Sequence, residues 1–272
     1  MQGRLDQWPV LATSGALEVR LAETDSEVEA AQRLRYRVFY EEMDAEPSAE
    51  MRAVRRDFDR FDDYCDHLLL VDRAVVDDEG QPTVVGCYRM MRDVDAARAG
   101  GFYTATEFDI APVLASIAKG TRFLELGRSC VIKEYRTKSA CVQLLWKGLM
   151  AFAARFSIDT MFGCASFAGT DPASLALPLS YLYHYHLAPP EIRVRARPEL
   201  FVNMNLIAKD AIDKREALRA LPPLLKGYIR TGCTIGDGAV IDHQFSTTDV
   251  FICVEISKMD SRYKSRFGLT EN

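Results

Sequence analysis

Residues 124–131 read LELGRSCV and place two ionisable residues, Glu125 and Arg128, inside a hydrophobic strand. A charged side chain in a buried strand needs a partner of opposite charge. Gly127 and Ser129 are small, so another backbone or a ligand can approach the strand closely. The pattern fits two interpretations, a buried Glu–Arg network that stabilises a sheet and an active centre, and the two can coexist.

The hydrophobic pattern around this stretch predicts an irregular order of strands and helices. Alternating or apolar runs predict strands at residues 17–22, 67–73, 83–91, 123–132, 160–166 and 250–256. Helical spacing predicts helices at residues 25–40, 111–118, 139–156, 174–186 and 222–231. Thr24 and Glu27 form a capping box at the start of the first of these helices.

This order predicts the fold class. Three strands come in succession before the second long helix, which differs from the βαβα alternation of a doubly wound fold. We therefore predict a single α/β (α+β) domain over residues 17–256, with tails at 1–16 and 257–272. Within it, residues 187–220 are expected to form an insertion, and the turn-rich residues 232–249 to precede the last strand.

Composition limits the classes of function. The formal net charge of −5 over 272 residues argues against general nucleic-acid binding. The seven cysteines form no CxxC pair, which is typical of reduced, buried thiols in a cytoplasmic protein and not of a disulfide framework or zinc site. The N-terminal residues do not resemble a signal peptide. Lys147 and Arg155 interrupt the most apolar helix, which is shorter than the roughly 20 residues of a membrane span.

Charged residues also cluster outside the LELGRSCV stretch. Residues 57–64 alternate aspartates with aromatic residues, and Asp59 and Asp62 belong to this acidic loop. The loop is either a solvated surface with its aromatic side chains turned inward or an acidic wall that receives an amine. Arg89 lies within the otherwise apolar strand 83–91 and requires a carboxylate partner if it is buried.

Four motifs in order carry a family resemblance. They are Arg35-x-x-x-Phe39, DRFD at 59–62, VGCYR ending at Arg89 and ELGR at 125–128. This set resembles the acyl-homoserine-lactone synthases, a branch of the GNAT-like N-acyltransferases. Longer strings, among them YRVFYEEMDA, FDDYCDHLLLVD, LELGRSCV, GCASFAGTDP and LPPLLKGYIRTG, resemble the bacterial L-ornithine Nα-acyltransferases more closely, over residues 18–256. The chain has EEMDAE where the lactone synthases carry a tryptophan, which argues against S-adenosylmethionine as the acceptor.

The resemblance implies a GNAT-like fold with a mixed sheet, splayed central strands and flanking helices. It also implies transfer of a 3-hydroxyacyl group from acyl carrier protein (ACP) to the α-amine of ornithine, which yields lyso-ornithine lipid. The thioester of the 4′-phosphopantetheine arm is then a co-substrate, and we expect no bound cofactor and no metal. Arg35 and Phe39, through their place in the shared motifs, are candidates for substrate binding.

The mechanism we expect is direct attack of the amine on the thioester carbonyl, without an acyl-enzyme. Glu125 is the first candidate for the base or the residue that orients a water molecule, with Asp59 and Asp62 as rivals. Arg128 and Arg89 are expected to orient carboxylates, either the protein's own or that of the amino acid. The N–H groups of Ser129, Cys130 and Val131 are candidates for stabilising the oxyanion. The alternative of Cys130 as a nucleophile is disfavoured, since a buried cysteine is usually a small hydrophobic residue.

The donor is predicted from the turn before the helix at 139–156. Acetyl-CoA enzymes of this fold carry a glycine-rich turn there, whose N–H groups bind a pyrophosphate. Here the segment reads YRTKSACVQ, without glycine, and basic residues surround it at Lys133, Arg136, Lys138 and Lys147. Such a surface suits acidic ACP, although a solvated helix start is the alternative. The arginines in RVRAR at 193–197 are candidates for transient contact with the inner face of the membrane.

The residues that would bind the amino-acid acceptor are less clearly indicated by the sequence. Asp242 and Asp249 are candidates for binding the δ-amine of ornithine, and turn capping explains them equally well. His184 and His186 lie two residues apart on a helix and point to different sides, so we favour structural roles over a metal site. Three functions remain open: an N-acyltransferase for ornithine or another amino acid such as glutamine or lysine, a lactone synthase, and a non-enzymatic acyl-ACP-binding or membrane-surface protein.

Overall fold

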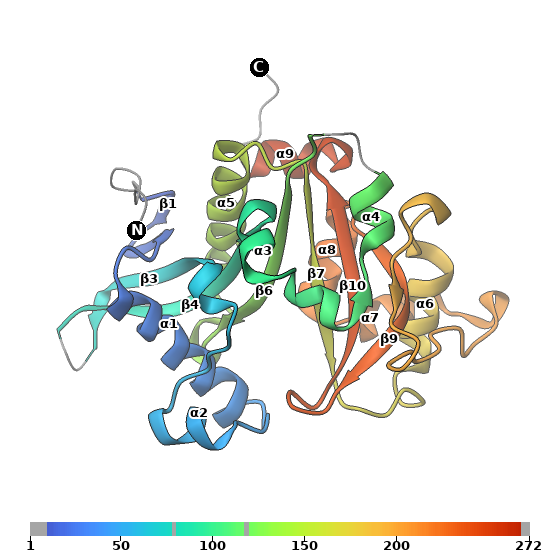
Figure 1. The fold of residues 1–272 in the computed structure, drawn as a ribbon, viewed down its shortest axis with the longest axis horizontal. Helices are drawn as coiled ribbons and strands as arrows, with labels where there is room; N and C mark the ends of the chain where they lie inside the picture. Colours follow the sequence, from blue (N-terminus) through green and yellow to red (C-terminus); the bar gives the residue numbers. More distant parts are fainter. Residues whose placement is uncertain (1–9, 78–79, 117–119, 268–272) are drawn as a thin grey trace. The chain divides into compact units, whose positions relative to one another are not determined.

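A computed structural model describes residues 10–77, 80–116 and 120–267 of the chain (Figure 1). Residues 1–9, residues 78–79 between the predicted strands 67–73 and 83–91, and residues 117–119, which include the end of the helix predicted at 111–118, lie outside the described residues. The chain divides into two compact units. The first comprises residues 1–91, 126–157 and 264–272, and the second residues 92–125 and 158–263.

The first unit contains a sheet in the order β1-β2-β3-β4-β6. Its strands are β1 (Ala12–Ser14), β2 (Leu17–Leu21), β3 (Asp66–Val76), β4 (Pro82–Arg92) and most of β6 (Phe123–Val131). The pairs β1–β2, β2–β3 and β3–β4 are antiparallel. Consecutive leucines at 68–70 in β3 are fully buried, which is expected of a strand covered on both faces.

Three α-helices lie entirely within the described residues of the first unit. They are α1 (Asp25–Tyr36), which continues as a π-helical turn at Arg37–Glu41, α2 (Ala49–Val54) and α5 (Ser139–Arg155). The capping box of Thr24 and Glu27 is present and starts α1 as predicted. A Cβ atom at Gly148 would overlap Cγ1 of Val19, so only glycine allows α5 to pack this closely on β2.

The second unit contains strands in the order β7-β10-β9-β8-β5, together with the first three residues of β6. The strands are β5 (Phe108–Asp109), β7 (Thr160–Ala168), β8 (Arg195–Ala196), β9 (Thr234–Asp242) and β10 (Thr247–Glu255). The β8–β9 pair is parallel, and β7–β10, β9–β10 and β5–β8 are antiparallel. The sheet is therefore mixed, as predicted.

Helices flank the strands of the second unit. They are α3 (Asp93–Ala99), α4 (Ala111–Ser116), α6 (Ala176–His186), α7 (Lys214–Ala220) and α8 (Pro223–Thr231), while the residues of α9 (Ser261–Arg266) are divided between the two units. α6 contacts β9 and α8 contacts β7. The core of this unit is aromatic, since Phe108, Phe162 and Phe251 are almost fully buried, and the ring of Phe251 lies 6.0 Å from each of the other two.

Three parts of the chain differ from the sequence-based expectation. Residues 234–242, predicted as turn-rich, form the strand β9. Its glycines misled the prediction: a Cβ at Gly236 would lie 2.9 Å from Cβ of Phe251, so glycine serves close packing there and not a turn. α3 lies between the strand predicted at 83–91 and the helix predicted at 111–118, where no element was predicted. β1 and α9 lie in the stretches assigned to terminal tails.

Candidate active site

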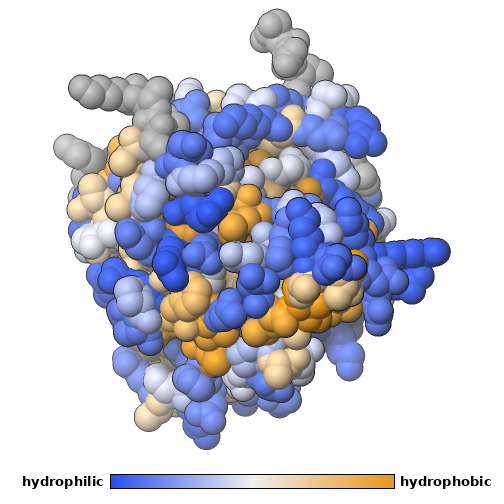
Figure 2. All heavy atoms as spheres, turned by 90° about the vertical axis from the view of Figure 1, so that its right-hand side faces the viewer, coloured by the Kyte–Doolittle hydropathy of each residue, from blue (hydrophilic) through white to orange (hydrophobic). Residues whose placement is uncertain are grey.

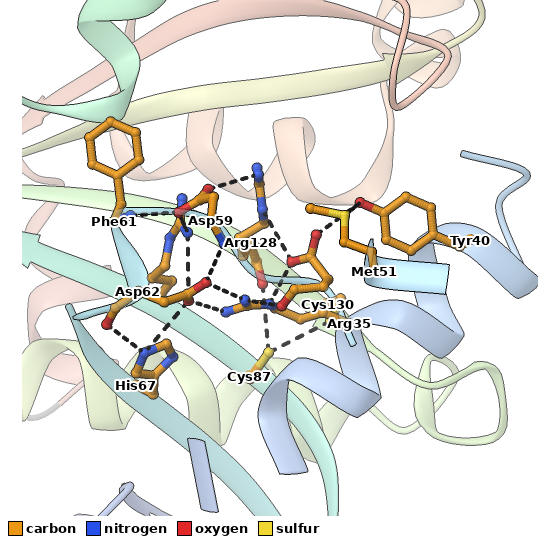
Figure 3. A network of polar contacts seen from close by, with 12 residues as sticks. Arg35, Tyr40, Met51, Asp59, Phe61, Asp62, His67, Cys87, Arg128 and Cys130 are labelled. Carbon is orange, nitrogen blue, oxygen red and sulfur yellow. Dashed lines mark hydrogen bonds and ion pairs between the residues drawn. The ribbon is translucent and has the colours of Figure 1, made fainter. Parts of the chain in front are cut away.

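A buried ion-pair network lies in the first unit (Figure 3). Arg35, in the last turn of α1, has no exposed surface. Its guanidinium donates to both carboxylate oxygens of Asp62 at 2.9 Å, and its Nε lies 2.7 Å from Oδ2 of Asp57. A bidentate arginine–carboxylate pair fixes the orientation of both groups. The network therefore attaches the acidic loop at 57–64 to α1.

A second layer of the same network centres on Asp59. Arg89 of β4 lies 2.7 Å from one oxygen of this carboxylate, and Arg128 of β6 lies 3.2 Å from the other. The side chain of Asp59 is 22% exposed, against 4% for Arg89. Both arginines thus orient one of the protein's own carboxylates, which was one of the two roles expected for them. Asp59 stands at the solvent-facing edge of the network.

The acidic loop is folded around its own carboxylates. Asp62 Oδ2 accepts the backbone N–H of Asp59 at 2.9 Å, and Asp59 Oδ1 accepts that of Phe61 at 2.8 Å. Phe61 is buried, whereas Asp63 is exposed. The loop is therefore neither a uniformly solvated surface nor a continuous acidic wall, because two of its aspartates, Asp57 and Asp62, are buried and paired with arginine.

The network has a defined charge state. Burial by itself would raise the pKa of Asp62, but Arg35 and Arg89 outweigh it and hold that pKa well below its usual range. Burial and the nearby Arg35 lower the pKa of His67 to about 4, so this imidazole is neutral at pH 7. Asp62 therefore stays ionised near neutral pH, and its lowered pKa makes it a weak proton acceptor.

The LELGRSCV stretch is locally strained and partly accessible. Arg128 has φ of 49°, a left-handed conformation that costs energy for a non-glycine residue in a strand. Residues 127–129 are half-buried between buried neighbours, and a Cβ built on Gly127 would meet no atom within 4 Å. The strand therefore presents open space at Gly127, where a ligand can approach the backbone.

Cys130 is not poised as a nucleophile. Its Sγ lies 3.7 Å from Sγ of Cys87, and this contact, together with burial, raises the pKa of the Cys130 thiol well above its usual value. The thiol stays protonated near neutral pH, and a thiol is a much weaker nucleophile than a thiolate.

Glu125 lies in the second unit and contacts main-chain donors. Its two carboxylate oxygens accept the backbone N–H groups of Tyr103 at 3.1 Å and Thr104 at 2.6 Å. These residues open the 3-10 turn Tyr103–Thr106, and the first N–H groups of a helical turn have no partner within the turn. Glu125 therefore caps this turn from a neighbouring strand. Its predicted role as base stays a prediction.

Three carboxylates of the second unit form an acidic cluster, which we call the Glu107 cluster. It consists of Glu107, which follows the 3-10 turn, Asp242 at the end of β9 and Asp249 in β10. One oxygen from each lies within 4.8 Å of the other two. Glu107 and Asp249 are buried, and Asp242 is half-buried.

Sequence reasoning identified Asp242 and Asp249 and missed Glu107. The available signal was an acidic residue beside the apolar pair of Phe108 and Ile110, as in the motifs that were noticed. The capping alternative for Asp242 is also real, since its Oδ1 accepts the N–H of Phe245 at 3.0 Å. Asp242 thus closes the β9–β10 turn and belongs to the cluster.

Within the Glu107 cluster, the pKa of Glu107 itself is raised. Burial, followed by the charges of Asp249 and Asp242, raises the pKa of Glu107 to about 7. The thiol of Cys164 donates to Glu107 Oε2 at 3.3 Å, and burial with this neighbour raises the pKa of Cys164 well above its usual value. A carboxylate that titrates near pH 7 inside an acidic cluster is a typical feature of a functional site.

The remaining sequence candidates are distributed over the surface. Phe39 is half-buried in the π-helical turn, and the four basic residues before and within α5 are exposed. Arg136 pairs with Glu42 at 2.5 Å, and Lys138 Nζ lies 3.7 Å from the centre of the Tyr135 ring. Lys133 and Lys147, the other two of these four basic residues, are also exposed.

Two other predictions concern histidines and the RVRAR stretch. His184 Nε2 lies 3.0 Å from the carbonyl oxygen of Ile207, in agreement with a structural role. Arg193 and Arg197 donate to backbone carbonyls of Ala188 and Ala105, each at 2.8 Å. Among the described residues, no helix combines the length and apolar character that a membrane crossing requires.

Proteins with known names resemble this chain in sequence. Residues 34–147 match the acetyltransferase (GNAT) domain family. The chain is 49% identical over 254 residues to an L-ornithine N(alpha)-acyltransferase of Agrobacterium fabrum, which covers 93% of this chain and 86% of that protein. It is 50% identical over 263 residues to the protein of that name from Brucella abortus, with 97% and 92% coverage. FeeM, an N-acyl amino acid synthase from uncultured soil microbes, is a structural neighbour with a TM-score of 0.48, 12% identity and coverage of 89% and 92%.

Proposed function

The chain belongs to the family of L-ornithine N(alpha)-acyltransferases, and from this premise we propose that it transfers a 3-hydroxyacyl group from an ACP thioester to the α-amine of L-ornithine. The product of this reaction is lyso-ornithine lipid. The observation that carries the proposal is the identity of about half of all residues, over nearly the whole chain, with proteins of that name. The predicted GNAT-like fold and acyltransferase activity are confirmed by the same comparisons.

The chemical step is aminolysis of a thioester. The neutral α-amine attacks the carbonyl carbon, a C–N bond forms, and the C–S bond breaks as the tetrahedral intermediate collapses. The pantetheine sulfur leaves as a thiol after it gains a proton, and the nitrogen loses one. No acyl-enzyme is required, and the protonated state of Cys130 agrees with this route.

We assign the proton acceptor to Asp59, acting directly or through a water molecule. Asp62 is buried and held strongly ionised by two arginines, and both oxygens of Glu125 accept backbone N–H groups. Asp59 has the largest exposed side-chain fraction of the three candidates. Arg89 and Arg128 hold its carboxylate in a fixed position, where an amine or a water molecule can reach it. Asp62 then serves to position Arg35, and Glu125 serves to position the backbone of Tyr103 and Thr104.

The donor assignment rests on the turn before α5. The segment from Tyr135 to Gln143 has no glycine, so it offers no flexible loop of N–H groups for a pyrophosphate. The exposed Lys133 and Lys147 favour an acidic protein as the carrier of the acyl group. ACP has this character and presents the acyl chain on a phosphopantetheine arm.

Because the product is a lipid, the proposal includes contact of the protein with a membrane surface. Hydrophobic side chains form a band between hydrophilic ones on the face of the second unit shown in Figure 2. Leu200 and Leu206, in the segment after β8, are 37% and 42% exposed. A protein with such a face can hold a peripheral position at the membrane and release an acylated product there.

The proposal is tested by incubating the protein with 3-hydroxyacyl-ACP and single amino acids, with mass detection of the N-acyl product. We expect product with ornithine, and a lower rate with the same acyl group on coenzyme A. Absence of product with ornithine, lysine, glutamine and glycine would exclude the proposed function. Formation of a lactone from S-adenosylmethionine would instead identify a lactone synthase.

A further inference from the structure

We propose that Glu107, Asp242, Asp249 and Thr247 bind the side-chain ammonium group of the amino-acid acceptor and thereby select diamino acids. This inference rests on the proposed function and names the part of the acceptor that the second unit recognises. The three carboxylates come from a loop and two strands that lie far apart in the sequence. Their convergence is therefore a property of the fold.

The spacing of the carboxylates fits an ammonium group. A primary ammonium has three N–H donors in a tetrahedral arrangement and no acceptor. Three oxygens at hydrogen-bond distance from such a nitrogen lie roughly 4.6 Å from one another. The oxygens of Glu107, Asp242 and Asp249 lie within 4.8 Å of one another.

A second observation points to a ligand at the same place. Thr247 is 7% exposed, and its Oγ1 has no hydrogen-bond partner among the residues that the structure describes. Thr247 pairs with Asp242 across β9 and β10, and Asp249 follows two positions later in β10. Paired residues and residues two apart project from the same face of a sheet. The side chain of Thr247 therefore projects from the same face of the sheet as those of Asp242 and Asp249.

This unpartnered hydroxyl is energetically unusual. Buried polar groups are nearly always hydrogen-bonded, because a missing partner costs the full desolvation of the group. An ammonium bound among the carboxylates would supply a donor to Thr247 Oγ1. The neighbouring Thr248, by contrast, already donates to the carbonyl of Gly169 at 2.8 Å.

The existing contacts favour an ammonium over a divalent metal ion. Glu107 accepts the Cys164 thiol, and Asp242 accepts the N–H of Phe245, so part of the acceptor capacity is already in use. Calcium requires six to eight oxygen ligands, and magnesium a nearly regular octahedron. Three carboxylates and one hydroxyl supply fewer ligands than either shell requires, whereas these four acceptors can share the three donors of an ammonium.

The test compares two acceptors that differ only at the side-chain terminus. Ornithine carries the δ-ammonium, and norvaline has a hydrogen atom in its place, so that its side chain ends in a methyl group. We expect the wild-type protein to have a much higher kcat/KM for ornithine, and Glu107→Gln and Asp249→Asn to lower the ratio of ornithine to norvaline by roughly 10- to 100-fold, as for the loss of a hydrogen bond to a charged group. Asp237→Asn is the matched control, since it removes a carboxylate of β9 that pairs with Arg195.

Calorimetry without an acyl donor separates failure of this inference from failure of the proposed function. Ornithine should bind the wild-type protein more tightly than norvaline, and Thr247→Val should weaken ornithine binding even if a carboxylate variant does not fold. An equal affinity for both amino acids, or an unchanged ratio in all three variants, would overturn the inference. Binding of calcium or magnesium ions alone, competitive with ornithine, would assign the cluster to a metal ion instead.

Discussion

The carboxylate of Glu125 accepts the backbone N–H of Thr104 at 2.6 Å, and this contact ties the LELGRSCV strand to the Glu107 cluster. The carbonyl oxygen of the same Thr104 accepts the N–H of Glu107 at 3.1 Å. Glu125 and Glu107 are therefore bonded to the N–H and the C=O of one residue. Glu125 is a positioning residue for the turn that carries Glu107.

Substitution of Glu125 by glutamine should weaken this anchor. The amide has one acceptor oxygen where the carboxylate has two, so we expect the free energy of unfolding to fall by about 1–3 kcal/mol. We also expect KM for the amino acid to rise more than kcat falls, with the pH profile of kcat/KM keeping its shape. Chemical denaturation and steady-state kinetics measure both. Loss of the acidic limb of the profile, with turnover lowered by roughly 10²-fold or more, would identify Glu125 as the base.

The raised pKa of Glu107 predicts how stability depends on pH. Burial, Asp249 and Asp242 raise this pKa from 4.5 to about 7, and contacts with Cys164 and Tyr103 oppose the shift. Between these two values the folded protein binds more protons than the unfolded chain. The stabilisation is therefore complete below about pH 4.5 and is lost as the pH rises through 7, by on the order of 1–3 kcal/mol.

The glutamine variant of Glu107 provides the reference for this measurement. His67, whose pKa is lowered to about 4, changes stability in the opposite direction, because its stabilisation is lost as the pH falls from 6.5 towards 4. Its contribution is common to both proteins and cancels in the difference. Denaturant unfolding at pH 5 and pH 8 should show a larger decline in the wild type than in Glu107→Gln. Parallel declines would contradict the assignment.

Two glycine substitutions distinguish a functional surface from a packing requirement. A Cβ at Gly127 would meet no protein atom within 4 Å, so Gly127→Ala should leave the melting temperature nearly unchanged. If the donor arm runs along this stretch, KM for the acyl donor should rise by roughly tenfold. In Gly148→Ala, the added methyl group overlaps Val19, and overpacking of this kind costs about 1–3 kcal/mol. An unaltered KM in Gly127→Ala would place the donor elsewhere.

Charge reversal tests the basic residues around the start of α5. Lys133→Glu and Lys147→Glu change exposed side chains and should leave the fold intact. We expect kcat/KM for acyl-ACP to fall by roughly tenfold at low ionic strength, and the rate with a small acyl-pantetheine thioester to stay constant. Lys209→Glu, an exposed lysine of the second unit, is the control. An equal loss with both donors would argue against an ACP surface.

Local patterns in the sequence determined much of the fold. The capping box of Thr24 and Glu27 acts over three residues, and the leucines at 68–70 mark a strand buried on both faces. Signals of this range depend only on neighbouring residues, so they can be recognised without tertiary structure. β9 was missed because Gly236 serves packing against Phe251, a contact between strands.

By itself, the sequence determined which charged residues are unusual and, through their order, which family they belong to. Only the tertiary structure decided their partners: Arg35 and Arg89 bind the protein's own aspartates, and Glu125 binds a main-chain turn. It also brought Glu107 together with Asp249, which lies 142 positions further along the chain. Such pairings depend on strand register and loop paths, which follow from packing of the whole chain and leave no local pattern.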